Sequence, residues 1–238
     1  MMSRLSAAAA ACLCLCLGAC ATEYVGTPFD HASNNGVKSI GLAGGALPEK
    51  AMAYEVASVG SNFGLVGALV DAGIQADRAN AVNAALTSDG FNGERELQSR
   101  IIAALAAQGY TVKAVDTGAR AKREFLAAYP TAGAPVDAYL DVVVQQYGYL
   151  SAGAFKPFRP TLVAKVRLVS AKDPSRTLME NTITYNAMYP TKGAITLSPN
   201  PDYAFKNRTE LLADPKRLEG GLDDALDQTA HTVAQLLH

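Results

Sequence analysis

Cysteine and histidine are the residue types of this chain best suited to nucleophilic, redox or metal chemistry. Its four cysteines all lie near the amino terminus, at positions 12, 14, 16 and 20. A zinc site usually needs a second pair of ligands further along the chain, and no cysteine follows Cys20. The spacing therefore predicts no metal site, and no disulfide bond in the chain that begins at Cys20.

The three histidines, at positions 31, 231 and 238, offer little for acid–base catalysis. Asp227 and His231 are four residues apart, which favours an exposed pair on one face of a helix. The chain contains no Gly-x-Ser-x-Gly elbow, no Walker loop and no His-Glu-x-x-His helix. We therefore predict no catalytic residues and no cofactor, and an enzyme is the third of three functional hypotheses.

Residues 1–19 have the form of an export signal. Arg4 supplies a positive charge, and an apolar run over residues 5–17 is too short to span a bilayer. The run ends in Leu17-Gly18-Ala19-Cys20, which resembles the lipobox of bacterial lipoproteins. The resemblance implies cleavage between Ala19 and Cys20 and acylation of Cys20, which would anchor the protein in a membrane. The alternative is an ordinary secretory signal with a coincidental cysteine.

The lipobox resemblance also implies a location. Ala21 follows the cysteine, whereas an Asp at that position is an inner-membrane retention signal in many Gram-negative bacteria. The expected location is thus the periplasmic face of the outer membrane. Without residues 1–19 the chain has 20 basic and 22 acidic side chains, and this balance gives no positive field for nucleic acid.

The remaining chain divides into a lipidated tether, residues 20–36, and one α/β (α+β) domain, residues 37–238. The domain is predicted to hold a mixed sheet with packed helices and a carboxyl-terminal antiparallel meander of three strands. Strands are expected at 38–43, 52–59, 110–115, 136–150, 161–169 and 177–189. Helices are expected at 56–86, 94–108, 119–129 and 203–212, with an irregular loop at 190–201. A last helix follows Asp214, its N-cap, and Pro215.

Alternation in the meander assigns each side chain to a face of the sheet. In the first strand, residues 138, 140, 142, 144 and 150 are expected to face the core. The opposite face would carry residues 137, 139, 141, 145 and 147. The charged residues of that face, Asp137, Asp141, Lys165 and Arg167, could form cross-strand ion pairs or a recognition surface.

Small residues recur at every fourth position over residues 60–76. These residues, the small-residue ridge, are Gly60, Gly64, Ala68, Ala72 and Ala76. Glycine costs roughly 1 kcal/mol in a helix interior, so close packing is needed to explain it. One hypothesis is a helix buried tightly against a sheet. The other is a surface for self-association or for contact with a membrane.

The segment Phe155-Lys156-Pro157-Phe158-Arg159-Pro160 joins two strands and combines aromatic with basic residues. Such loop tips are typical of contact surfaces, so Phe155, Lys156, Phe158 and Arg159 are candidate partner contacts. The alternative is a connection stiffened by proline, with both phenylalanines folded back into the protein.

The order of strands and helices resembles that of several envelope α/β domains. These are the amino-terminal domain of TolB, the curli secretion lipoprotein, and lipoproteins that activate penicillin-binding proteins. The resemblance implies a domain that binds or assembles with an envelope protein rather than one that catalyses a reaction. The leading hypothesis is therefore a binding or assembly module, and the second is a self-assembling homo-oligomeric component.

Overall fold

The computed structural model describes residues 26–44, 47–56, 64–88, 90–118, 120, 122–130, 135–188 and 192–238. The strands are β1 (Ser39–Ala43), β2 (Met52–Glu55), β3 (Thr111–Val115), β4 (Ala138–Ser151), β5 (Arg159–Ser170), β6 (Thr177–Tyr185) and β7 (Ile195–Leu197). The helices are α1 (Gly64–Ser88), α2 (Gly93–Ala107), α3 (Arg208–Ala213) and α4 (Pro215–Gln235), with a 3-10 turn, η2, at Pro201–Tyr203.

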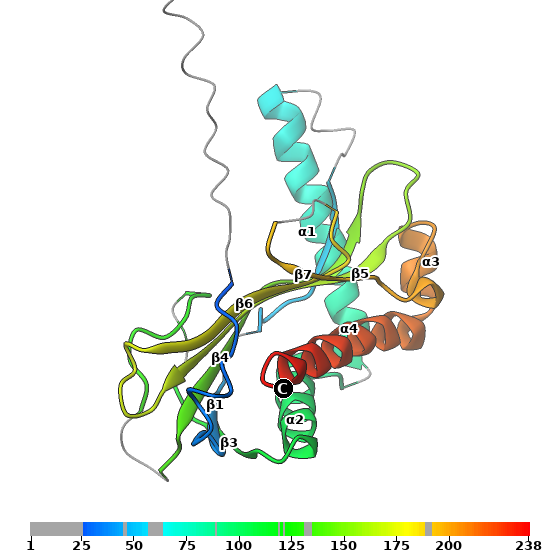
Figure 1. Ribbon diagram of the computed structural model, residues 1–238. Coiled ribbons are helices and arrows are strands. Elements are labelled where there is room, and N and C mark those ends of the chain that lie inside the picture. The colour runs from blue at the N-terminus through cyan, green and yellow to red at the C-terminus, as the bar shows by residue number, and fades with distance from the viewer. Residues whose placement is uncertain are drawn as a thin grey trace, which may run out of the picture.

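The strands form one mixed sheet in the order β3-β1-β4-β5-β6-β7, and β2 pairs with the second half of β4 (Figure 1). Strands β4, β5 and β6 form the antiparallel meander, whereas β1, β2, β3 and β7 pair in parallel. The predicted fold class is therefore confirmed. Strand β7 lies in the loop that we expected to be irregular, and β6 ends at Tyr185, four residues before the predicted end.

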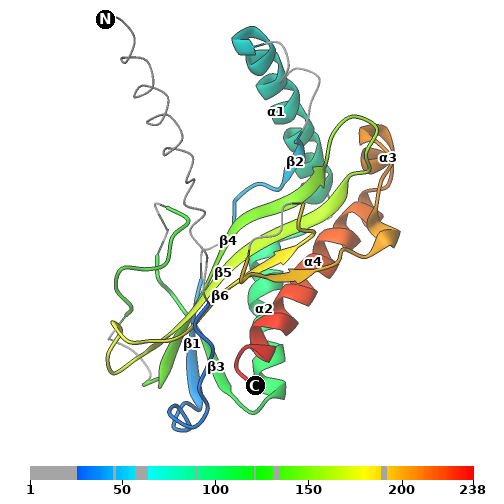
Figure 2. The ribbon, with the colours of Figure 1, turned by 45° about the horizontal axis from the view of Figure 1, so that its top comes forward.

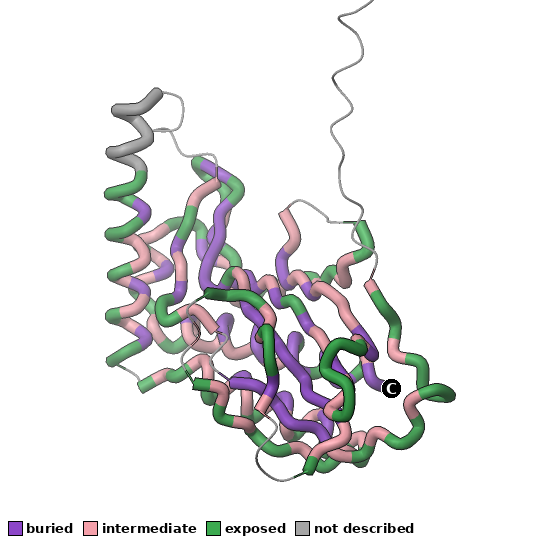
Figure 3. The backbone as a smooth tube through the Cα atoms, turned by 90° about the vertical axis from the view of Figure 1, so that its left-hand side faces the viewer, coloured by how far each residue is buried: buried purple, intermediate pink, exposed green. Residues whose placement is uncertain are grey.

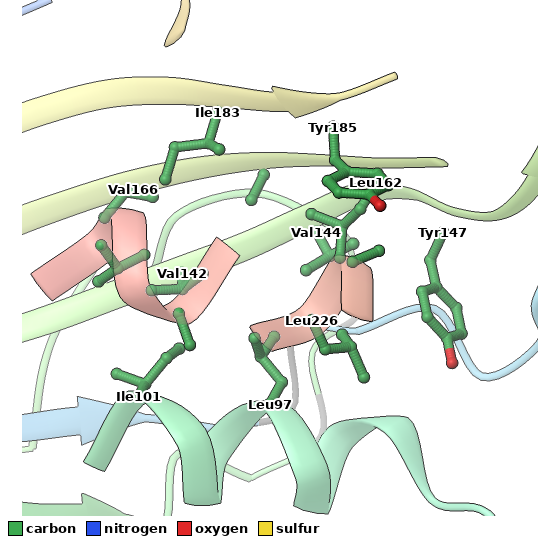
Figure 4. Packing of buried hydrophobic residues seen from close by; sticks show 14 of the residues in the cluster. Leu97, Ile101, Val142, Val144, Tyr147, Leu162, Val166, Ile183, Tyr185 and Leu226 are labelled. Carbon is green, nitrogen blue, oxygen red and sulfur yellow. The ribbon is translucent and has the colours of Figure 1, made fainter. Parts of the chain in front are cut away.

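Helices α2 and α4 lie together on one face of the sheet (Figures 1 and 2). Asn92 caps α2 and Asp214 caps α4, each by accepting a hydrogen bond from the backbone three residues later. In Figure 4, Leu97 and Ile101 of α2 point toward the strands, close to Leu226 of α4. Burying this apolar face is the main favourable term that holds the layers together.

A β-bulge in β4 changes which side chains face these helices. The register with β5 shifts between Val144 and Gln146, so Gln145 is an extra residue in the ladder. Before the bulge even-numbered residues face the core, and after it Tyr147 and Tyr149 do. Tyr147 was predicted to face away from the core and Leu150 to face it, and both predictions are wrong. They assumed unbroken alternation along the strand, and the bulge inverts the alternation after Gln145.

Helix α1 buries Val82 and Leu86 in the core, and its contacts with β2 are made by polar side chains rather than by small ones. The Gln75 amide hydrogen-bonds the backbone N and O of Glu55, at 3.2 and 3.1 Å, and Asn83 does the same at Ala51. Arg78 pairs with the Glu55 carboxylate at 3.1 Å. These amides satisfy the free backbone edge of β2, which would otherwise be open to another strand. The described helix begins at Gly64 rather than near residue 56.

The segment expected to form a helix at 119–129 is irregular where it is described. The buried Asp141 carboxylate explains this, because it accepts the Leu126 N–H at 2.9 Å and pairs with Arg120 at 2.9 Å. It also accepts the Tyr129 hydroxyl at 3.1 Å, and burial together with this carboxylate raises the pKa of Tyr129 to about 12. The Leu126 N–H and the Tyr129 hydroxyl thus donate to a side chain of β4 and not to a carbonyl one helical turn earlier. The predicted helix is therefore wrong.

We predict that Asp141→Ala lowers the free energy of unfolding by about 3–5 kcal/mol, because it leaves the Arg120 charge buried without its partner. Urea denaturation of the two proteins measures the change. Asp77→Ala is the matched control, since this carboxylate lies on an exposed residue of α1 and its loss should change stability by less than about 0.5 kcal/mol. Equal stability of Asp141→Ala and wild type would contradict a structural role for the pair.

Candidate functional site

A cavity of about 570 Å³ lies on the face of the sheet opposite α2 and α4. Val163 and Thr161 line it, whereas Leu162 and Ala164, which alternate with them along β5, are in the core. We call this cavity the open-face groove, because none of the described residues that line it belongs to a helix. Its lining is uncharged and consists of Met52, Tyr54, Val56, Gln146, Leu150, Thr161, Val163, Thr182, Thr184, Asn186, Ala187 and Met188. The volume and the mainly apolar lining are typical of a small-molecule site.

Gly148 positions the β2 wall of the groove. Its φ is 142°, and a Cβ atom on it would lie 2.0 Å from the Met52 carbonyl oxygen. Only glycine lets β2 approach β4 this closely, and β2 then supplies Met52 and Tyr54 to the groove. The bulge at Gln145 supplies the other wall, because it turns Leu150 onto this face.

Asn186 sits where the groove meets a second cavity, and its backbone is unusual. Its φ is 63°, in the left-handed region that asparagine tolerates better than most residues, and its N–H donates to the Leu197 carbonyl at 3.0 Å. The residue is only 8% exposed, and its Nδ2 has no hydrogen-bond partner among the described residues. A buried amide without a partner costs about 1–3 kcal/mol, so an oxygen atom of a ligand would be favoured there.

The second cavity, of about 290 Å³, shares Leu150, Asn186, Ala187 and Met188 with the groove. It adds Lys156 and Arg159, two of the residues that the sequence marked as partner contacts, so we call it the basic cavity. Both residues are exposed, and neither forms an ion pair within the described residues. The uncharged groove is therefore continuous with a positively charged end.

The loop between β4 and β5 separates the two candidate phenylalanines. Phe155 is fully exposed with a φ of 64°, whereas Phe158 is 5% exposed and exchanges backbone hydrogen bonds with Phe205 at 2.7 and 2.9 Å. The buried Ser151 hydroxyl donates to backbone carbonyls of the loop, which fixes this shape. Phe158 is thus a core residue, and the prediction that it contacts a partner is corrected. Phe155 remains available for contact.

The small-residue ridge is only partly described. Gly60 lies outside the described residues, and only the backbone of Gly64 and Ala68 is described. Ala72 and Ala76 are exposed, as is Ile74 at 43%. In Figure 3 the described residues of α1 alternate between exposed and buried, while buried residues gather along the central strands. For its described part, the hypothesis of a ridge buried against the sheet is therefore wrong.

The cleavage and lipidation residues, Ala19 and Cys20, lie outside the described residues. The described chain begins at Gly26, and Thr27 forms an antiparallel bridge with Glu180 of β6, with hydrogen bonds of 2.7 and 2.9 Å. Asn34 accepts a hydrogen bond from Arg176 at 3.0 Å. The described part of the expected tether therefore contacts the domain, and its contact nearest to Cys20 in the sequence is with β6.

Other groups that could support chemistry are dispersed. His231 and Asp227 form the expected pair, at 3.6 Å, and Asp227 also accepts a hydrogen bond from Arg100 at 2.7 Å. The Tyr147 hydroxyl is buried, lines a 350 Å³ cavity beside Glu94, and has no partner among the described residues. Burial raises the pKa of Tyr147. The described residues contain no group of three His, Cys, Asp or Glu side chains placed to bind a metal.

Lys156 and Arg159, which the sequence predicted as partner contacts, line the basic cavity, but sequence reasoning missed the groove beside them. The available signal was Gly148 inside an alternating strand, which indicates a bulge or a close backbone approach.

Among the described helices, none has the length and apolar character needed to cross a bilayer. Comparisons with protein-family models, with curated proteins and with solved structures find no match to this chain.

We predict that Phe158→Ser lowers the free energy of unfolding by about 3–5 kcal/mol, because it empties a buried aromatic site. Phe155→Ser is the matched control on the same loop, and it should change the free energy of unfolding by less than about 0.5 kcal/mol. Thermal and urea unfolding of both variants test the difference. Similar stabilities for the two variants would mean that Phe158 does not support the fold.

Proposed function

We propose that this protein is a lipoprotein held at the periplasmic face of the outer membrane, and that its domain binds an envelope component in the open-face groove. The groove carries the proposal, because a 570 Å³ cavity whose described lining is uncharged and comes from strands and loops is a surface suited to binding. The lipobox Leu17-Gly18-Ala19-Cys20 supports the location.

The lining of the groove supports binding rather than catalysis. The described residues that line it include no His, Cys, Asp, Glu, Lys or Arg, so they offer none of the usual general acids, general bases and strong nucleophiles. Its polar groups are the hydroxyls and amides of threonine, glutamine, asparagine and tyrosine, which orient a ligand by hydrogen bonds. The remaining side chains supply apolar contact.

The short chain between Cys20 and the domain supports a site close to the membrane. Thr27 is seven residues after Cys20, and seven extended residues span at most about 25 Å. Thr27 pairs with Glu180, and the groove residues Thr182 and Thr184 follow on the same strand. Acylation of Cys20 would therefore hold this side of the sheet within a few nanometres of the bilayer.

Self-assembly is the second candidate function, and one observation favours it. Ala72, Ile74 and Ala76 are exposed on α1, so small residues and an apolar one are available for contact with a second copy.

We predict that the wild-type protein, isolated from membranes, has an intact mass corresponding to a chain that begins at an acylated Cys20. Cys20→Ser should abolish the lipid and release the protein from the membrane fraction, because the thioether bond needs the sulfur atom. The folded domain should be unchanged by circular dichroism. A mature amino terminus at another residue, without added lipid, would overturn the proposed anchor.

We predict that a photoreactive benzoylphenylalanine at Thr182 forms an adduct in intact cells, because its side chain lines the groove. The same residue at Lys113, on the exposed strand β3, is the matched control and should give far less adduct. Mass analysis of the product identifies the component. Equal labelling at both positions would contradict a binding site in the groove, and a dimer of this chain captured from Ala72 would favour self-assembly.

A further inference from the structure

We propose that the open-face groove and the basic cavity together bind one anionic phospholipid of the membrane to which the protein is anchored. An acyl chain lies in the groove, and the phosphate lies beside Lys156 and Arg159. This inference rests on the proposed function and specifies the ligand of the same site.

The division of charge along the site carries the inference. The groove is lined by uncharged residues, and the basic cavity that continues it from Leu150 and Met188 adds two cations. An apolar chain gains free energy from the first part, and an anionic head group gains it from the second. A peptide would have to match both parts with side chains of the right kind, whereas a phospholipid joins an apolar chain to an anionic group in one molecule.

The shape of the lining also suits an acyl chain. Met52 and Met188 have flexible, polarizable side chains that adapt to an irregular apolar ligand. Where the two cavities meet, Asn186 presents the buried Nδ2 that has no partner among the described residues. An ester carbonyl joins the chain to the head group of a phospholipid, and it would provide the acceptor at this junction.

The surroundings of the site indicate that the ligand comes from a bilayer. Phe155 is fully exposed next to Lys156, and an exposed aromatic ring beside cations suits the boundary between head groups and acyl chains. The backbone of Phe155 is held by the loop that Ser151 fixes, so this exposure is built into the fold. The described contact with the domain nearest to Cys20 in the sequence is with β6, which forms one wall of the groove.

Two lipids that share one acyl chain test the inference on the mature chain with Cys20→Ser. Isothermal titration below the micelle concentration compares myristoyl-lysophosphatidylglycerol, which is anionic, with myristoyl-lysophosphatidylcholine, which is zwitterionic. We expect saturable binding of one anionic lipid per chain, and binding of the zwitterionic lipid about tenfold weaker because it gains less from the two cations. Equal affinity for both lipids, or no saturable binding, would overturn the inference.

Variants of the two parts should have different effects. Lys156→Glu with Arg159→Glu should weaken the anionic lipid at least tenfold and leave the zwitterionic lipid within about twofold. Lys113→Glu with Lys122→Glu changes the net charge equally on exposed residues outside both cavities, and should change neither affinity by more than about twofold. Similar losses for both double variants would mean a general charge effect and would overturn the inference.

Val163→Glu places a carboxylate in the groove and should abolish binding of both lipids. The melting temperature of Val163→Glu shows whether the variant still folds. If it does not fold, the variant with Lys156→Glu and Arg159→Glu still tests the inference, because both residues are exposed. Retained binding in a folded Val163→Glu protein would overturn the inference. A photo-adduct at Thr182 with the mass of a protein rather than of a lipid would also overturn it, while the proposed function of binding in the groove would stand.

Discussion

The extra residue at Gln145 determines how both faces of the sheet are used. Antiparallel pairing of β4 with β5 requires alternation, and one additional residue inverts it for the rest of the strand. Tyr147 and Tyr149 therefore turn toward the helices, and the Tyr149 hydroxyl donates to the Leu218 carbonyl of α4 at 3.0 Å. The same inversion places Leu150 on the opposite face, where it lines both the groove and the basic cavity.

The face opposite the helices is covered at one end and open at the other. Near β1, Asp141 and Arg120 hold the irregular segment against β4, and Tyr129 of this segment stacks on Tyr139 of β4 with ring centroids 5.3 Å apart. Beyond the bulge the uncharged residues that line the groove replace these charged and aromatic residues. The buried pair of Asp141 and Arg120 thus holds a segment over one half of the face, and the other half carries the open-face groove.

Much of the fold follows from local patterns that the sequence displays. Alternation predicted β4, β5 and β6, because their side chains segregate between a core and a second face, and the Asp214-Pro215 pair marked the start of α4. Patterns failed where a distant group overrides local preference. The 119–129 segment is held by Asp141 rather than by its own hydrogen bonds. Helix α1 binds the backbone of β2 through two amides, which hydrophobic periodicity does not indicate.

The candidate site was predictable only in part for a related reason. A loop that combines aromatic and basic residues is visible in a sequence, so Phe155, Lys156 and Arg159 could be found. Whether a given ring is buried depends on a distant partner, and Phe205, 47 positions after Phe158, supplies it. A groove is harder still, because its walls come from β2, β4, β5 and β6 and its volume depends on how these pack.

The site and the proposed anchor are linked through one strand. The backbone of β6 pairs with Thr27 at Glu180 and with β7 from Ile183 onward, so both groups share the edge of the strand that faces away from β5. A compact domain of this length has a radius of gyration of roughly 17 Å, so its width exceeds the roughly 25 Å that seven extended residues can span. Acylation at Cys20 would then prevent the domain from moving far from the membrane, and the point on β6 where Thr27 pairs would stay within about 25 Å of it. A lipid would thus meet the groove without leaving the neighbourhood of the bilayer.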